Sequence, residues 1–367
     1  MRIVFVLTRS DYLSGPQVHL RDLGSALTAK GHQVRIAAGG TGPFSEELER
    51  VGLAYTPLRR MAVPIRPCTD LRGIFEIVSL LRREKPDLVS VHSSKAGVLG
   101  RIAARICGVP VIHTAHGWAF TDAVPGAGRY HVAERLAAPL ARKIITVCER
   151  DRKLALETGV GTESQLVTIH NGMTDVDPAL RADPSISPPR LVMVSRLAEQ
   201  KDHATLFHAL AKLRNKDWEL DLAGDGPLRA ELEQLAHDLD IAKRVHFLGA
   251  RSDVAEILAR SQLFLLISNY EGFPRSILEA MRAGLPVIAS DVAGVHESVV
   301  HDRNGLLTPR GDAEVLSQRI ETMLDAPERR AAMGREGREL YERSFTFEAL
   351  FEKTCRVYSE ILGETVG

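Results

Sequence analysis

The sequence predicts an α/β protein made of two consecutive domains, each with a parallel sheet covered by helices. The chain has 367 residues, a length that suits two domains of ordinary size. Short runs rich in Val and Ile alternate with amphipathic stretches, as buried parallel strands alternate with helices. The alternation stops once, in a proline-rich stretch, and then restarts. Together these observations predict two doubly wound domains joined by a linker.

The first domain is expected over residues 1–175. Its predicted strands are five apolar runs bounded by polar, Gly or Pro residues. They are Ile3–Leu7, Val34–Ala38, Leu88–His92, Val109–Thr114 and Ile144–Cys148. Between them, His19–Lys30 and Leu71–Arg83 have the spacing of amphipathic helices.

Residues 176–190 are predicted to form the linker, because they are rich in proline and show no periodicity. The second domain is expected over residues 191–345, again with five strands. These are Leu191–Ser195, Leu220–Ala223, Val245–Leu248, Leu263–Ile267 and Val287–Ser290. The last segment, residues 346–367, contains an amphipathic stretch at Glu348–Leu362.

The formal charge is balanced, with 47 basic and 47 acidic residues, but unevenly distributed. Up to Asp175 there are 23 Lys/Arg and 16 Asp/Glu, and the remainder holds 24 and 31, so the two domains are expected to face different partners. No nucleic-acid partner is expected.

The four cysteines lack metal-ligand spacing and fit a reducing cytosol. Because no apolar run reaches about 18 residues and the N-terminal run is too short for a signal peptide, a cytoplasmic location is expected.

Two predicted domains of this type leave a cleft between them, and ligands bind beyond the carboxyl ends of the strands. In the first domain, the loop TRSDYLSGPQVH contains Gly15 before a helix, which suits an anion but also an ordinary turn. It has no Gly-x-Gly-x-x-Gly, which argues against a dinucleotide dehydrogenase. The loop HSSKAGVLGR at 92–101 suits ligand contact, although Ser93 or Ser94 would equally cap a helix.

His116 follows another predicted strand, in HTAHGWAF. A single histidine is often a structural residue. Trp118 and Phe120 beside it favour a wall that faces a sugar, with His116 as a functional side chain.

In the second domain, Arg196 and Lys201 follow the first strand. Two cations at a strand end suit a diphosphate, although two cations alone also fit a solvated surface. The next turn, AGDGP, contains Gly224 and Gly226, which would either admit a nucleotide base or simply make the turn.

The segment SNYEGFPRSILEAMRAG at 268–284 is the strongest candidate. Pro274 suits the first turn of a helix, and Gly284 suits its end. The loop at 271–273 would point backbone N–H groups at the cleft. Glu271 and Glu279 lie eight positions apart and would accept hydrogen bonds from hydroxyls, one on a ribose and one on a sugar ring. The alternative is that a glutamate here only complements the helix dipole.

Over nearly its whole length, the chain resembles the retaining family-4 glycosyltransferases of the GT-B fold. The most specific feature is the pair Glu271 and Glu279 around GFPRSIL, followed by AMRAGLPVIASDVAGVHE and DRNGLLTP. The resemblance implies two Rossmann-like domains facing a central cleft that closes on the ligands. It also implies a C-terminal helix, within residues 346–367, that crosses back and packs on the first domain.

The resemblance also implies roles for individual residues. Glu279 would bind the donor ribose and Glu271 the donor sugar near its reacting carbon. The backbone of Gly272 and Phe273 would contact the sugar and phosphate. Arg196 and Lys201 would bind the diphosphate. Gly15 would contact the phosphate, and His116 would contact the sugar at the reaction centre. The catalytic set is thus His116, Glu271, Arg196 and Lys201. Many relatives have two glycines where this chain has Ser14-Gly15, and Pro16 follows, so the phosphate contact of this loop is open.

The loops HSSKAGVLGR and HTAHGWAF resemble a bacterial subgroup that adds a sugar, often an N-acetylhexosamine, to a polyprenyl-diphosphate-linked saccharide. We therefore expect a UDP-sugar donor, a lipid-linked saccharide acceptor and a role in surface polysaccharide or glycan assembly. The acceptor-side candidates are His92, Ser93, Ser94 and Lys95. The alternatives are a GDP-sugar donor, a soluble acceptor, a sugar-nucleotide epimerase of the same fold, or a non-catalytic sugar-nucleotide-binding protein, against which both glutamates and both cations argue.

No cofactor or metal is expected, because Arg196, Lys201 and helix N-termini would stabilise the leaving diphosphate. Asp175–Asp177 is interpreted as solvated linker, and the sequence shows no His/Cys cluster that suggests zinc.

A basic segment with apolar neighbours predicts peripheral contact with anionic lipid on the inner face of the membrane, and the alternative is a solvated helix face. Its basic residues are Arg59, Arg60, Arg66, Arg72, Arg82, Arg83 and Lys85, and its apolar ones are Met61, Val63 and Ile65.

Overall fold

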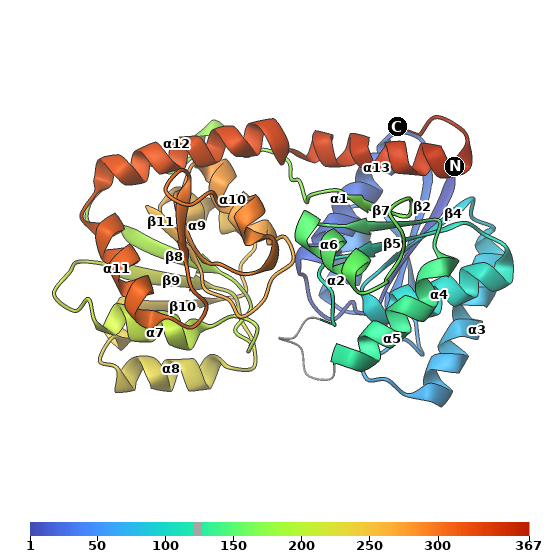
Figure 1. Ribbon diagram of the computed structural model, residues 1–367, viewed down its shortest axis with the longest axis horizontal. Helices are drawn as coiled ribbons and strands as arrows, with labels where there is room; N and C mark the ends of the chain where they lie inside the picture. Colours follow the sequence, from blue (N-terminus) through green and yellow to red (C-terminus); the bar gives the residue numbers. More distant parts are fainter. Residues whose placement is uncertain (121–126, 367) are drawn as a thin grey trace. The chain divides into compact units, whose positions relative to one another are not determined.

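The computed structural model describes residues 1–120 and 127–366 (Figure 1). They form two compact units. The first comprises Met1–Asn171 together with Leu350–Gly367, and the second comprises Gly172–Ala349. Each unit is built on one parallel sheet with helices packed against it, which confirms the predicted α/β class.

The sheet of the first unit has seven parallel strands in the order β3-β2-β1-β4-β5-β6-β7. The strands are β1 (Arg2–Leu7), β2 (Gln33–Gly39), β3 (Ala54–Leu58), β4 (Leu88–His92), β5 (Val111–Ala115), β6 (Lys143–Thr146) and β7 (Leu166–Thr168). β1 is an inner strand, with Ile3 opposite Val34 on one side and Leu88 on the other. The sequence pattern did not predict β3 and β7. They are the two edge strands, and β3 includes Pro57, which an edge strand tolerates because one side of it needs no donor.

Helices and short 3-10 turns connect these strands. They are α1 (Gly15–Ala29), α2 (Pro43–Arg50), α3 (Pro67–Glu84), α4 (Ser94–Cys107), α5 (Ala127–Ala137), η1 (Ala138–Leu140) and α6 (Glu149–Glu157). α3 and α4 pack against each other, with Ile77, Leu81 and Ala103 in the core that they share with the sheet. Along the two described stretches of the chain, we find no helix with the length and apolar content needed to cross a membrane.

A buried ion pair joins α4 to α5. Arg101 and Glu134 are almost completely buried, and a terminal guanidinium nitrogen donates to the carboxylate. The Arg101 Nε donates to the Gly97 carbonyl at 2.8 Å, which fixes the side chain along its own helix. Burial raises the pKa of Glu134, and the guanidinium opposes that shift. The pair is therefore a structural element of the first unit.

The sheet of the second unit has six parallel strands in the order β10-β9-β8-β11-β12-β13. The strands are β8 (Arg190–Val194), β9 (Glu219–Ala223), β10 (Val245–Gly249), β11 (Leu263–Leu266), β12 (Val287–Ser290) and β13 (Gly305–Thr308). The first five match predicted strands. β13 was not predicted, because it is a four-residue edge strand that begins at a glycine.

The connections of the second unit include the helix that carries the strongest sequence candidate, α10. They are η2 (Pro178–Leu180), α7 (His203–Ala211), α8 (Arg229–Asp238), η3 (Ala242–Arg244), α9 (Val254–Ala259), α10 (Arg275–Ala283), η4 (Ala293–Glu297), α11 (Ala313–Leu324) and α12 (Pro327–Ser344).

The segment 176–190 differs from the linker that its prolines predict, because it lies within the second unit. The buried Arg330 of α12 holds it in place, donating to the carbonyls of Pro184 at 2.8 Å and Ile186 at 2.9 Å. The last helix, α13 (Phe347–Leu362), belongs from Leu350 onward to the first unit, as expected for a C-terminal helix that crosses back. Lys143 and Glu360 form an ion pair of 2.7 Å that ties α13 to β6.

Each sheet has one point at which the strand order reverses. In the first unit this switch point lies between β1 and β4, and in the second it lies between β8 and β11. Connections on the two sides of such a point leave in opposite directions, so a crevice opens beyond the carboxyl ends of the strands. The loops that follow these four strands contain most of the candidate residues.

Candidate active site

Two loops meet at the switch point of the first unit. The hydroxyls of Thr8, after β1, and Ser93, after β4, are hydrogen-bonded at 2.6 Å. The Ala96 N–H in the first turn of α4 also donates to Thr8 Oγ1 at 3.1 Å. Ser93, a predicted acceptor-side residue, has a left-handed φ of 68° and directs its hydroxyl to Thr8. It therefore shapes the junction of the two loops.

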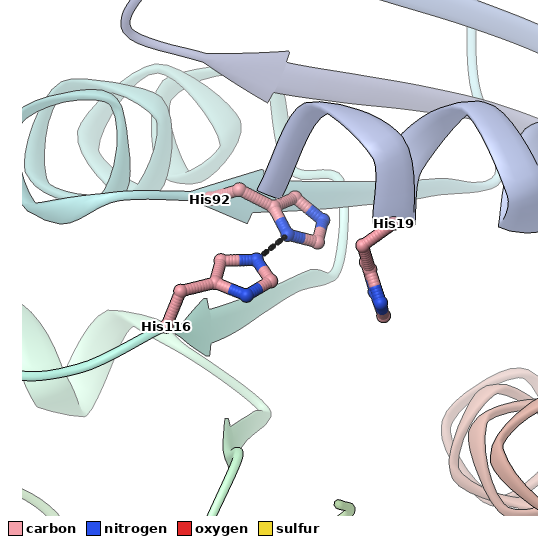
Figure 2. Close-up of side chains that lie close together, drawn as sticks. All are labelled: His19, His92 and His116. Carbon is pink, nitrogen blue, oxygen red and sulfur yellow. Dashed lines mark hydrogen bonds between the residues drawn. The ribbon is translucent and has the colours of Figure 1, made fainter. Parts of the chain in front are cut away.

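A chain of hydrogen bonds runs within the first unit from Ser90, on β4, to His116. Ser90 Oγ lies 3.0 Å from His92 Nε2, and His92 Nδ1 lies 3.0 Å from His116 Nε2 (Figure 2). The His92 and His116 rings are stacked, with centroids 5.3 Å apart. His116 is therefore oriented from behind by groups in the core.

His92, another predicted acceptor-side residue, is only 1% exposed. Its burial, with the neighbouring His116 as the next cause, holds its pKa well below the usual range for histidine. Both of its nitrogens contact other side chains, Ser90 and His116. The geometry thus places His92 behind His116.

Lys95 and Ser94, the remaining acceptor-side candidates, lie at the start of α4. Lys95 Nζ forms an ion pair of 2.6 Å with Asp70 of α3 and donates to the Pro64 carbonyl at 2.5 Å. This lysine therefore anchors the segment that precedes α3.

Gly15 is the first residue of α1, as a phosphate-binding helix start would require. The preceding Ser14 is extended, and its hydroxyl donates to the Gln17 side chain at 2.5 Å. The first turn contains no acidic residue, so its backbone N–H groups keep the positive end of the helix dipole.

Trp118 and Phe120 do not form the wall predicted for them. Both are buried in an apolar cluster with Ile144 and Leu166, and their rings stack at a centroid distance of 4.9 Å. The Trp118 indole N–H donates to the Asp151 carbonyl at 2.9 Å. They are core residues, because the chain turns inward directly after His116.

In the second unit, the structure brings together two predicted catalytic residues at the switch point. Lys201, after β8, donates from Nζ to the carboxylate of Glu271, after β11, and their side chains are 13% and 6% exposed. The Ser268 hydroxyl donates to the same Glu271 oxygen at 2.6 Å. Backbone bonds join the two loops, from Asp202 to Ile267 at 2.9 Å and from Asn269 to Gln200 at 2.8 Å. An acid–base pair is thus held rigidly at the crevice of the second sheet.

His203, the first residue of α7, supports this pair, although no sequence pattern singled it out. Its ring lies 3.2 Å from Ser195 Oγ and 3.1 Å from the Lys201 carbonyl. Burial lowers the pKa of His203 to about 4, so the ring is neutral at neutral pH. It holds the loop between β8 and α7 without adding charge.

Arg196 lies in the same loop and is exposed. The loop passes very close to the next turn. A Cβ on Gly224 would lie 1.9 Å from the Ser195 carbonyl oxygen, and one on Gly226 would lie 2.2 Å from that of Leu197. Of the two predicted uses of these glycines, the structure supports the tight turn, since only glycine permits this contact between backbones.

The segment 268–284 forms a loop and a short helix. α10 begins at Arg275, with Pro274 just before it, and ends at Gly284 in a left-handed conformation with a φ of 82°. Glu271 therefore lies in the loop, and Glu279 alone of the two glutamates lies on the helix. Gly272 and Phe273 are buried, and the Phe273 ring packs on Phe345 at a centroid distance of 5.2 Å.

The two aspartates that resemble a metal motif have structural partners. Asp175 forms an ion pair with Arg338 of α12, which holds the pKa of Asp175 below its usual range. Asp177 caps η2 by accepting from the Ala179 N–H at 2.8 Å. Both aspartates are exposed to solvent, as interpreted, but they belong to the second unit and not to a separate linker.

The two halves of the chain match two known families. Residues 14–172 match the glycosyl transferase 4-like domain, and residues 179–340 match the glycosyl transferases group 1. An Escherichia coli relative, the UDP-Gal:alpha-D-GlcNAc-diphosphoundecaprenol alpha-1,3-galactosyltransferase, is 32% identical over 267 residues, which cover 67% of this chain and 68% of the relative. The chain belongs to the family-4 glycosyltransferases.

Other comparisons cover almost all of this glycosyltransferase. The N-acetyl-alpha-D-glucosaminyl L-malate synthase of Bacillus anthracis is 26% identical and covers 99% of this chain and 98% of its own. The crystal structure of HepE from Anabaena in complex with UDP and glucose has a TM-score of 0.83 at 23% identity, covering 97% of this chain and 99% of that chain. That of WaaG, a glycosyltransferase involved in lipopolysaccharide biosynthesis, has a TM-score of 0.73 at 17% identity. These likenesses establish the GT-B fold for the glycosyltransferase.

Proposed function

We propose that this enzyme transfers a sugar from a UDP-sugar to a hydroxyl of a lipid-linked saccharide, with retention of anomeric configuration. The observation that carries the proposal is the Lys201–Glu271 pair at the switch point of the second sheet. The activity for which the E. coli relative is named supports a UDP-linked donor and a diphosphoundecaprenol-linked acceptor.

In the proposed mechanism, Arg196 and Lys201 stabilise the negative charge that develops on the leaving diphosphate. The N–H groups at the start of α1, beginning with Gly15, add their dipole to this stabilisation. Glu279 accepts from the ribose hydroxyls, and the backbone of Gly272 and Phe273 holds sugar and phosphate. The charge of this chain's own residues suffices in this scheme, so we propose a reaction that needs no metal.

Glu271 and His116 are assigned to the donor sugar. One Glu271 oxygen, Oε1, accepts from both Lys201 and Ser268. Two donors on this oxygen stabilise the carboxylate and reduce its strength as a nucleophile. We therefore favour an electrostatic role for Glu271 over a covalent intermediate, with leaving diphosphate and incoming hydroxyl on the same face of the sugar.

The donor can be identified by a thermal-shift screen with UDP- and GDP-sugars, because a ligand that binds the folded state raises its apparent stability. We expect UDP and one UDP-sugar to raise the transition temperature and GDP-sugars to leave it unchanged. Incubation with the donor alone, in the presence of EDTA, then tests for an epimerase. Conversion to a new free nucleotide sugar without acceptor would contradict a transferase.

The acceptor is tested with a synthetic diphosphoprenyl saccharide and with L-malate, the acceptor named for the B. anthracis relative. We expect glycosylation of the lipid-linked saccharide. Transfer to malate instead would keep the glycosyltransferase assignment and overturn the acceptor.

We also propose peripheral contact with anionic membranes through an apolar–basic surface on α3 and the loop before it. Val63 and Ile65 are each 52% exposed, and Leu71 and Phe75 are 55% and 61% exposed. Exposed arginines lie among them, at positions 59, 60, 66 and 72. Apolar side chains insert at the interface while arginines attract anionic headgroups.

The loop and the helix present this surface as one piece. Glu76 of α3 accepts from the backbone N–H groups of Arg59 and Arg60, at 2.8 and 2.9 Å. In a flotation assay, we expect binding to vesicles with anionic lipid at moderate salt and loss of binding in Leu71→Ser/Phe75→Ser. Val300→Ser, at an exposed apolar residue of the second unit, is the matched control. Absence of wild-type binding would sink this part of the proposal.

A further inference from the structure

Three imidazoles from three different elements converge in the first unit. His19 lies on α1, His92 at the end of β4 and His116 just after β5 (Figure 2). One ring nitrogen from each lies within 4.8 Å of the other two. The sequence shows no His/Cys cluster, because the three residues are far apart along the chain and only the parallel sheet brings them together.

The spacing of these nitrogens is close to that of ligands around one ion. Three nitrogens bound tetrahedrally at zinc–nitrogen distances lie about 3.4 Å from one another. His92 Nδ1 and His116 Nε2 are 3.0 Å apart. The rings of His19 and His116 meet edge to face, at a centroid distance of 5.2 Å. Rotation of the imidazoles about their side-chain torsions closes the remaining difference.

A second layer of contacts already orients one of these ligands. Ser90 Oγ lies 3.0 Å from His92 Nε2, which leaves His92 Nδ1 facing the other rings. A hydrogen bond to the far nitrogen is the usual support of a metal-binding histidine, and it sets which nitrogen offers its lone pair. His116 offers its Nε2 lone pair when its proton is on Nδ1, so the ion replaces the His92–His116 hydrogen bond.

The ligand set indicates which ions fit. Three neutral nitrogens with an open fourth position suit zinc and related transition metals. Mg²⁺ and Ca²⁺ require oxygen ligands, and the three side chains offer none. His19 and His92 are buried and His116 is partly exposed, so an ion would enter from the side of His116.

We propose that His19, His92 and His116 bind a single transition-metal cation of the Zn²⁺ type. Binding fixes the His116 ring on the metal and places a positive charge beside it. It therefore withdraws His116 from the donor sugar and inhibits transfer reversibly. This inhibitory consequence rests on the proposed function, whereas binding of the ion does not.

The binding test uses metal-free, untagged protein titrated with Zn²⁺ against a chromophoric chelator. We expect one tight site in the wild type, unaffected by excess Mg²⁺, and its loss in His19→Gln and His92→Gln. Ser90→Ala retains all three ligands and should weaken the affinity about 10–100-fold. His237→Gln, at a histidine of the second unit whose side chain is 81% exposed, should bind like the wild type.

A spectroscopic measurement keeps the test meaningful if a histidine variant folds poorly. Co²⁺ in place of Zn²⁺ should give the visible absorption of a tetrahedral nitrogen site in the wild type and a weakened response in Ser90→Ala. No tight Zn²⁺ site in the wild type, or equal affinity in all variants, would overturn the proposed site.

Activity is measured separately. We expect Zn²⁺ to inhibit transfer, EDTA to restore it, and Ser90→Ala to need a correspondingly higher Zn²⁺ concentration. Zn²⁺ binding without inhibition would overturn the inhibitory role. Tight Zn²⁺ binding in a protein that uses no sugar nucleotide would instead contradict the proposed function and leave the metal site standing.

Discussion

Both units carry polar side chains near the switch point of their sheet. The groups compared are neutral in the first unit and charged in the second. In the first unit, a chain of hydrogen bonds links Ser90 and His92, on the switch-point strand β4, to His116, just after the neighbouring β5. In the second, Lys201 and Glu271 form an ion pair at the equivalent position between β8 and β11. One unit offers imidazoles and hydroxyls, and the other offers full charges.

Under the proposed function, the difference matches the two parts of a nucleotide sugar. A diphosphate needs cations and directional donors, and the second unit holds Lys201 at its switch point. A sugar ring needs groups that both donate and accept without adding charge, such as imidazoles. The same topology thus provides two kinds of recognition, and the variants below test whether that division holds.

The largest effect is expected on stability, at the buried ion pair to which we assign a structural role only. Glu134→Ala removes one partner of the buried Arg101–Glu134 pair and leaves an uncompensated guanidinium in the core. We expect unfolding free energy to fall by about 3–5 kcal/mol, measured by denaturant titration. Turnover per folded molecule should stay close to wild type. A selective loss of turnover without loss of stability would show that this pair belongs to the active site.

The next largest effect is expected on activity, at the lysine assigned to the leaving diphosphate. Lys201→Ala removes the cation that we propose for the leaving diphosphate, and we expect kcat/KM to fall by about 10²–10³-fold. The matched control is Lys212→Ala, which removes a half-exposed lysine paired with Glu314 in the same unit. Equal activity of the two variants in a steady-state assay would mean that the Lys201–Glu271 pair is structural.

A smaller effect concerns the neutral His203 that holds the Lys201 loop. Its folded pKa of about 4 lies below the ordinary 6.5, so its contribution to stability is complete above pH 6.5 and is lost as pH falls toward 4. The loss attributable to this group is about 3 kcal/mol. In urea titrations across this range, His203→Gln should show a correspondingly weaker pH dependence, and His237→Gln should follow wild type. Parallel pH profiles for all three proteins would contradict the assignment.

The smallest effect is expected for the support of His116. His92→Leu removes the side chain behind His116, and we expect kcat to fall by about 10–100-fold through misplacement of that ring. Donor affinity, measured by calorimetry with UDP, should change little, because the groups assigned to the diphosphate are untouched. Ser90→Ala should give a milder decrease of the same kind. A loss of UDP affinity that matches the loss of kcat would place His92 in donor binding instead.

Much of the fold could be predicted, because buried parallel strands are marked by runs such as Ile3–Leu7 and Leu263–Ile267. The edge strands β3, β7 and β13 lack that signal and were missed, whereas the edge strand β10 was predicted from the run Val245–Leu248. The prolines of 176–190 suggested a free linker, but the carbonyls of Pro184 and Ile186 are bound by the distant Arg330. Such a contact leaves no local trace in the sequence.

The candidate site shows the same limit. Its loops could be placed at strand ends, and Lys201 and Glu271 were both selected from their positions. Side-chain direction could not be predicted, because the turn after His116 decides that Trp118 faces the core. Nor could the meeting of His19, His92 and His116 be predicted, because the order of the strands determines it.

The most direct test of the central claim is the anomeric configuration of the product, read by NMR. The reaction would contain the UDP-sugar identified in the screen, a synthetic lipid-linked saccharide and EDTA. We predict a new glycosidic bond with the configuration of the donor, formed only when donor and acceptor are both present. A product of inverted configuration, or no product without added metal, would contradict this prediction.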